Sequence, residues 1–151
     1  MPTLRKLPPK LKIYEALWAI ADERIKIDGI LAYQGTVYSA SSKGKSYTIS
    51  YNPDTNIVSS NDNGSVHQGY LGYPIIAFFL KNWKLNYNTE ILPMLKNIDR
   101  IEIKQQVNKS HEESLRVLLG KLFQQGFDVD VLVRECENIY QQLEKLQLQK
   151  E

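Results

Sequence analysis

Apolar side chains recur at helical spacing near the start of the chain, and charged residues fill the opposite face. This pattern predicts a helix over residues 10–23, with Pro9 in its first turn. The backbone N–H groups of a first turn have no acceptor within the helix, so proline loses no hydrogen bond there. Residues 1–9 are basic and contain Pro8 and Pro9, so we expect them to form a flexible basic arm. The apolar stripe consists of Ile13, Tyr14, Leu17, Trp18, Ile20 and Ala21.

From residue 24 the hydrophobic period changes to two, which is typical of β-strands. Residues 24–27 and 30–40 alternate on either side of Asp28-Gly29, a dipeptide that supplies the positive φ angles of a tight hairpin. The two segments are therefore predicted to pair as strands. An alternative interpretation continues the first helix to Gly29, which would then cap its C-terminus.

Two more turn signals follow, at residues 43–44 and 52–55, and each precedes a segment rich in β-branched or aromatic residues. We therefore expect an antiparallel meander of three or four strands. If both turns close as two-residue loops, Val37 lies on the polar face of the sheet. The core face then carries Tyr38, Tyr47, Ile49, Tyr51 and Val58.

Residues 70–80 form the most apolar run of the chain, and residues 73–83 are predicted to form a buried central helix. The run has 11 residues, and a membrane-spanning helix needs about 20, so we expect no membrane association. Residues 86–108 are ambiguous: they suggest a short helix kinked at Pro93, followed by a strand that contains Ile101 and Ile103.

The C-terminal part predicts two helices. Ser110 and Glu113 have the spacing of a capping box, and Gly126 marks the end of the helix that follows. Residues 129–146 carry a second apolar stripe, which begins after an N-cap at Asp128 or Asp130. The chain is thus predicted to be one α+β domain over residues 10–151. It has an N-terminal helix, the meander and the buried helix in a body of residues 10–109, and an antiparallel helical hairpin in residues 110–151.

Charge and cysteine content narrow the function only slightly. The net charge is +2, with +5 in residues 1–109 and −3 in residues 110–151, which is too small an imbalance to indicate a dedicated polyanion-binding protein. Cys136 is the only cysteine, so an intramolecular disulfide and a cysteine-based metal cage are excluded. This composition favours a reducing compartment, and we expect a cytoplasmic protein.

The glycine-rich stretch of residues 61–73 contains His67, one of two histidines in the chain. Its sequence matches neither a calcium loop nor a nucleotide-binding loop, and no histidine or cysteine spacing suits zinc. We therefore predict no catalytic residue, no metal and no cofactor, and consider an enzyme the less favoured class. If the stretch binds a small ligand or an anion, the candidate residues are Asn61, Asp62, His67 and Tyr70.

Nucleic-acid binding is the second hypothesis. The basic arm and the predicted hairpin tip could contact a phosphate backbone, although the tyrosines between them are expected to pack in the core. The candidate contacts are Arg5, Lys6, Lys10, Lys12, Lys43 and Lys45.

The leading hypothesis is a non-enzymatic protein that acts through protein–protein association, as a homodimer. The stripe in residues 129–146 is wider than a coiled-coil seam, so part of it could be covered by a second copy of the chain. The candidate interface residues are Val129, Leu132, Ile139, Tyr140, Leu143 and Leu146.

Overall fold

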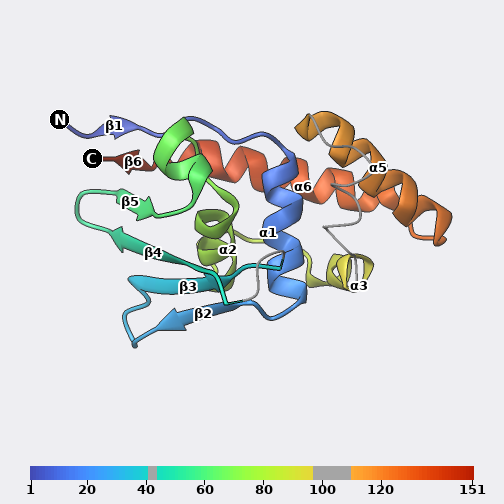
Figure 1. Cartoon of the computed structure of the whole chain (residues 1–151), viewed down its shortest axis with the longest axis horizontal. Helices are drawn as coiled ribbons and strands as arrows, with labels where there is room; N and C mark the ends of the chain where they lie inside the picture. Colours follow the sequence, from blue (N-terminus) through green and yellow to red (C-terminus); the bar gives the residue numbers. More distant parts are fainter. Residues whose placement is uncertain (41–43, 97–109) are drawn as a thin grey trace.

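A computed structural model describes residues 1–40, 44–96 and 110–151. Within these ranges a mixed sheet is covered by helices, so the fold class is α+β (Figure 1). The strands are β1 (Thr3–Leu4), β2 (Ile25–Asp28), β3 (Gln34–Tyr38), β4 (Ser46–Asn52), β5 (Ile57–Ser60) and β6 (Gln149–Lys150). The helices are α1 (Leu11–Ala21), the π-helix η1 (Gly64–Gln68), α2 (Tyr73–Lys81), the 3-10 helix η2 (Thr89–Ile91), α3 (Leu92–Leu95), α5 (His111–Gln124) and α6 (Val129–Leu146).

The sheet has the order β1-β6-β5-β4-β3-β2. Strands β2 to β5 form the expected antiparallel meander. The sheet extends beyond the predicted meander, because β6 joins parallel to β5 and β1 joins antiparallel to β6. Two-residue strands at the chain ends are too short to produce a recognisable period of two. Figure 1 shows the two ends of the chain side by side at this edge.

The N-terminal residues differ from the expected flexible arm. Thr3 pairs with Lys150, and the Arg5 side chain is buried with only 7% of its surface exposed. Lys6 continues the contact through a parallel bridge to Tyr70. Residues 3–6 are therefore part of the folded body.

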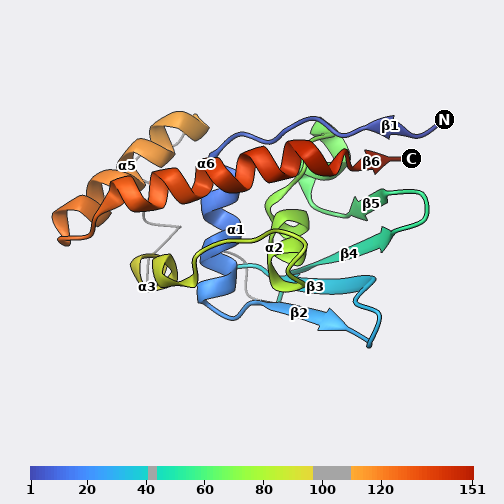
Figure 2. The ribbon, with the colours of Figure 1, turned by 180° about the vertical axis from the view of Figure 1, so that it is seen from behind.

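Helix α2 packs against the inner face of the sheet and is the centre of the core. Every residue from Tyr73 to Leu80 is buried, as the apolar run predicted. Gly35 in β3 allows the Phe78 ring to approach, since a Cβ at this glycine would lie 2.8 Å from the ring. Helix α1 packs beside α2, and α6 runs back across α1 toward β6 (Figures 1 and 2).

The hairpin interpretation of residues 24–29 is confirmed, and the extended first helix is wrong: α1 ends at Ala21 and β2 begins at Ile25. The connection is longer than the tight turn that Asp28-Gly29 suggested, because Asp28 pairs with Gln34. Positive φ angles occur at Gly29 and at Ala32 within this loop.

One face assignment in the meander is wrong. Val37 is completely buried, whereas Tyr38 is 49% exposed on the outer face. The two-residue turn that we assumed does not form, since Tyr38 pairs with Ser46. This register differs by an odd number of residues from the predicted one, so the side chains of β3 change faces. Tyr47, Ile49, Tyr51 and Val58 share the inner face as predicted.

The remaining helices follow their sequence signals. Ser110 Oγ accepts a hydrogen bond from the Glu113 N–H at 3.0 Å, and Asp128 caps α6. Helices α5 and α6 run in opposite directions (Figures 1 and 2). Pro93 lies in the first turn of α3, and the strand expected around Ile101 and Ile103 falls outside the described residues. Among the described helices, none combines the length and the hydropathy needed to cross a membrane.

Candidate functional site

The segment between β5 and α2 is held by a buried polar network. The Asp62 carboxylate accepts hydrogen bonds from the Ser65 N–H at 3.1 Å and from the Ser65 hydroxyl at 2.8 Å. Ser65 Oγ in turn accepts from the Gly72 N–H at 3.2 Å. Asp62 and Ser65 are 6% and 3% exposed, so this network stabilises the turn around η1 from the inside.

Arg5 joins the N-terminal segment to the same network. Its Nε donates to the Val58 carbonyl at 3.0 Å, and one Nη donates to the carbonyls of Ser65 and Tyr70 at 3.0 and 3.4 Å. Burial lowers the pKa of the Arg5 guanidinium, and the nearby Asp62 carboxylate opposes this shift. Arg5 is therefore a structural cation that fixes the chain on both sides of η1.

Two positions of this segment require glycine for steric reasons. A Cβ on Gly64 would overlap the Tyr70 ring, and a Cβ on Gly72 would overlap the Asp62 carboxylate. Glycine is needed at these two positions because the backbone runs against side chains of its own segment. A π-helix such as η1 is rare and frequently occurs at functional sites.

A hollow of about 900 Å³ opens beside η1. Both histidines reach it, His67 from η1 and His111 from the first turn of α5. We call this site the two-histidine hollow. Its lining residues are Pro9, Lys12, Asn63, Gly64, His67, Gln68, Tyr70 and His111.

The described lining of the two-histidine hollow carries one ammonium group and several hydrogen-bond donors. None of the described residues that line it is acidic. Lys12 Nζ lies 3.2 Å from a carboxylate oxygen of Glu15, which is 5% exposed, so the ammonium is fixed on α1. Burial raises the pKa of the Tyr70 hydroxyl, and the negative charges of Glu15 and Asp62 raise it further. Tyr70 therefore stays protonated and keeps its ability to donate a hydrogen bond.

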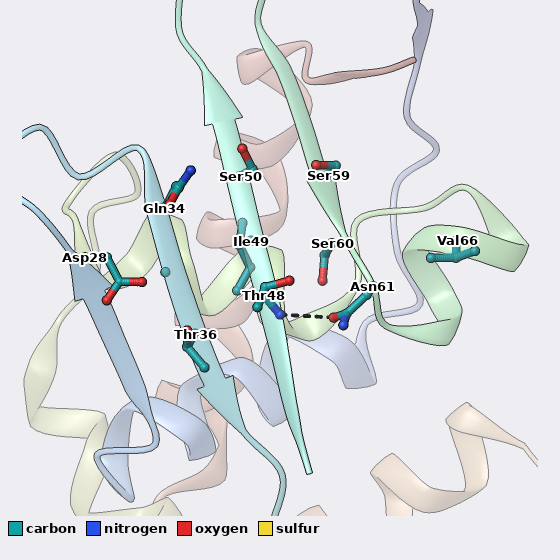
Figure 3. A pocket seen from close by; sticks show the side chains of 11 residues that line it. Asp28, Gln34, Thr36, Thr48, Ile49, Ser50, Ser59, Ser60, Asn61 and Val66 are labelled. Carbon is teal, nitrogen blue, oxygen red and sulfur yellow. Dashed lines mark hydrogen bonds between the residues drawn. The ribbon is translucent and has the colours of Figure 1, made fainter.

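A second concavity lies on the outer face of the sheet and extends to Val66 of η1 (Figure 3). It has a volume of about 460 Å³ and is rich in hydroxyl and amide groups. The Asn61 side chain lies beside Thr48, and its Oδ1 accepts from the Thr48 N–H at 3.0 Å. The lining residues are Asp28, Gln34, Gly35, Thr36, Thr48, Ile49, Ser50, Ser59, Ser60, Asn61 and Val66.

The four ligand-binding candidates have separate positions. Asn61 lines the outer concavity, Asp62 is buried in the network, and His67 and Tyr70 line the two-histidine hollow. Sequence reasoning did not include His111 among the candidate residues. No local signal connects His111 with η1, because the two segments meet only in the folded chain.

The candidate nucleic-acid contacts do not form a common surface in the described residues. Arg5 is buried in the network described above, and Lys12, which forms an ion pair with Glu15, lines the two-histidine hollow. Lys10 forms an ion pair with Glu137 of α6 at 2.7 Å. Lys6 and Lys45 are exposed, and the Lys45 ammonium lies 5.4 Å from the Tyr47 ring centroid. Lys43 lies outside the described residues.

The candidate interface residues of α6 are largely used within the chain itself. Leu132, Ile139 and Leu143 are at most 1% exposed and belong to the core, and Val129, Tyr140 and Leu146 pack partly against it. The apolar stripe is therefore explained by intramolecular packing.

Over the described ranges, no cluster of three or more histidine, cysteine, aspartate or glutamate side chains is arranged to hold a metal ion. No curated protein and no solved structure matches the chain. Residues 5–149 match the model of a family described as "Uncharacterised conserved protein UCP014422", a range that includes the buried network and the two-histidine hollow. The chain belongs to this family.

Proposed function

We propose that the protein binds a small anionic molecule in the two-histidine hollow. The observation that carries the proposal is the meeting of both histidines, Lys12 and Tyr70 at one concavity whose described lining has no carboxylate. A volume of about 900 Å³ lies within the range of small-molecule sites, which is roughly 300–1,000 Å³.

The lining residues suit a carboxylate or a phosphate ester. Imidazole, ammonium, phenol and side-chain amide groups all donate hydrogen bonds, and donors that carry charge make the stronger bonds to an oxyanion. Lys12 is held by Glu15, and Tyr70 by the packing of its ring on Gly64. Two of the donors are thus positioned before any ligand arrives, which reduces the entropy lost on binding.

The direct test is a titration monitored through the histidine ring signals in NMR spectra. Glycerol 3-phosphate and citrate serve as a phosphate ester and a carboxylate, with uncharged glycerol as the control ligand. We expect the anions, and not glycerol, to shift the ring signals of both His67 and His111. Shifts that are absent for both anions, or that appear equally with glycerol, contradict the proposal.

Substitutions of the two histidines test whether the anion binds in the two-histidine hollow. His67→Gln and His111→Gln are each expected to weaken binding about tenfold, the value of one charge-assisted hydrogen bond. Lys145→Gln removes an exposed cation from α6 and is the matched control. Equal losses in all three variants would show a nonspecific effect of net charge and would remove the proposal.

We also propose that binding takes place in the cytoplasm. The support is Cys136, a buried free thiol that is the only cysteine of the chain. Binding of this kind involves no chemical step, so the protein acts as a binding protein and not as an enzyme.

A further inference from the structure

Strand β2 leaves one side of its backbone unpaired within the described part of the chain. It lies at the end of the strand order and pairs with β3 only. The Tyr38 N–H donates to the Arg24 carbonyl at 2.8 Å, so Arg24 and Tyr38 are a hydrogen-bonded pair of the β2–β3 ladder. Because hydrogen-bonded pairs alternate, Lys26 and Asp28 direct their backbone groups toward β3. Ile25 and Ile27 therefore direct theirs toward the open edge.

The charges on β2 are complementary to those of a second β2 strand that runs antiparallel to it. Lys26 and Asp28 lie two residues apart, so both side chains project from the outer face of the sheet. Both are exposed, and neither has an ion-pair partner among the described residues. Natural edge strands often carry charges that prevent pairing, but a lysine and an aspartate flanking one residue repel only a parallel or a shifted copy.

We propose that two copies of this chain associate through β2, as an antiparallel pair centred on Ile27. In this register Ile27 of each copy exchanges two backbone hydrogen bonds with Ile27 of the other. Lys26 of one copy then lies opposite Asp28 of the other, twice by symmetry. These positions are non-hydrogen-bonded pairs, in which opposing Cα atoms approach to about 4.5 Å and the side chains are closest.

Exposed apolar residues next to β2 add to this contact. Ile30, Leu31 and Tyr33 follow the strand and are 102%, 70% and 42% exposed. In an antiparallel pair the loop after β2 of one copy lies beside the start of β2 in the other. The three side chains therefore supply apolar surface that a four-residue strand cannot bury by itself.

Sedimentation equilibrium on the full chain measures the association, and charge reversal tests the register. Lys26→Asp alone and Asp28→Lys alone each place like charges in opposition, and we expect the dimer Kd to rise about tenfold or more. The double variant Lys26→Asp/Asp28→Lys is expected to recover the wild-type Kd. Lys145→Asp, on the exposed side of α6, is the matched control and should leave the Kd unchanged.

Mixing the two single variants gives the sharpest result. One then carries two acidic residues at these positions and the other two basic ones, so a mixed dimer has two attractive pairs. We expect heterodimers from two preparations that are each largely monomeric. A monomeric wild type, a Kd that ignores the charge reversals, or a mixture that stays monomeric would each overturn the proposal. Melting curves of the variants check that each remains folded.

Discussion

The Nε of Arg5 lies 3.0 Å from the carbonyl oxygen of Val58, and this contact joins the N-terminal segment to the last strand of the meander. The same guanidinium bonds the carbonyl of Ser65, so one buried cation holds three segments together. A residue that belonged to an expected flexible arm is thereby part of the framework of the candidate site.

Replacing Arg5 should destabilise the fold strongly. Arg5→Ala leaves the buried carbonyls of Val58 and Ser65 unpaired and Asp62 without its nearby cation. We expect a loss of about 3 kcal/mol in the free energy of unfolding, measured by urea denaturation. Lys6→Ala, at an adjacent exposed residue, is the control and should change stability by less than about 0.5 kcal/mol. Similar losses for both variants would contradict this role of Arg5.

Alanine substitutions at two glycines should change the stability of the fold in opposite directions. Gly72→Ala places a methyl group on the Asp62 carboxylate and should cost roughly 1–3 kcal/mol of stability. Gly120→Ala, in α5, has open space around the new methyl group and should stabilise by about 0.5–1 kcal/mol because alanine favours a helix. Thermal unfolding of the two variants compares them directly, and a stable Gly72→Ala protein would show that the segment adjusts without cost.

Cys136 makes stability depend on pH in alkaline solution. Burial raises the pKa of the Cys136 thiol strongly, and its hydrogen bond with Tyr14 only partly opposes this shift. The folded protein therefore keeps the thiol proton that the unfolded chain loses above about pH 8.5. Each further pH unit should lower the free energy of unfolding by about 1.4 kcal/mol.

The control for this pH dependence is Cys136→Ala. This variant should lose stability everywhere through its small cavity, but it should show a flatter profile between about pH 8.5 and 10. Denaturant titrations across this range give the slope. Parallel profiles for wild type and variant would assign the alkaline loss to other groups.

Two substitutions of Asn56 distinguish the contribution of its backbone conformation from that of its side chain. Its φ is 60°, and its side-chain amide donates to the carbonyls of Leu146 and Gln147 at 2.8 and 2.7 Å. Asn56→Gly keeps the backbone conformation and loses these bonds, at about 1–2 kcal/mol. Asn56→Ala should destabilise the fold by roughly 1 kcal/mol more than Asn56→Gly, because alanine disfavours positive φ. Equal unfolding free energies for the two variants would exclude backbone strain as a cause.

Local patterns in the sequence were sufficient to predict α1, α2, α5, α6 and the meander, because each of these elements carries its own period or cap. The face of β3 was mispredicted because it depends on the length of the following turn, and Val37 and Tyr38 are both plausible core residues. Pairing of Thr3 with Lys150 could not be predicted, since no property of two-residue segments specifies so distant a partner.

The candidate site was only half predictable for the same reason. His67 and Tyr70 belong to one glycine-rich stretch and were identified together. Lys12 and His111 come from α1 and α5, and only the packing of these helices brings them to the two-histidine hollow. The burial of Arg5 was equally invisible, because its acceptors are backbone carbonyls, which any residue supplies.

The strand order also constrains how the chain is assembled during synthesis. Thr3 is translated long before its partner Lys150, which follows the whole meander and both long helices. The meander and α2 can collapse early, as contacts close in sequence do. Strand β1 has to wait for β6, so a nascent chain paused before residue 149 would hold an almost complete body with Thr3 and Leu4 still unpaired.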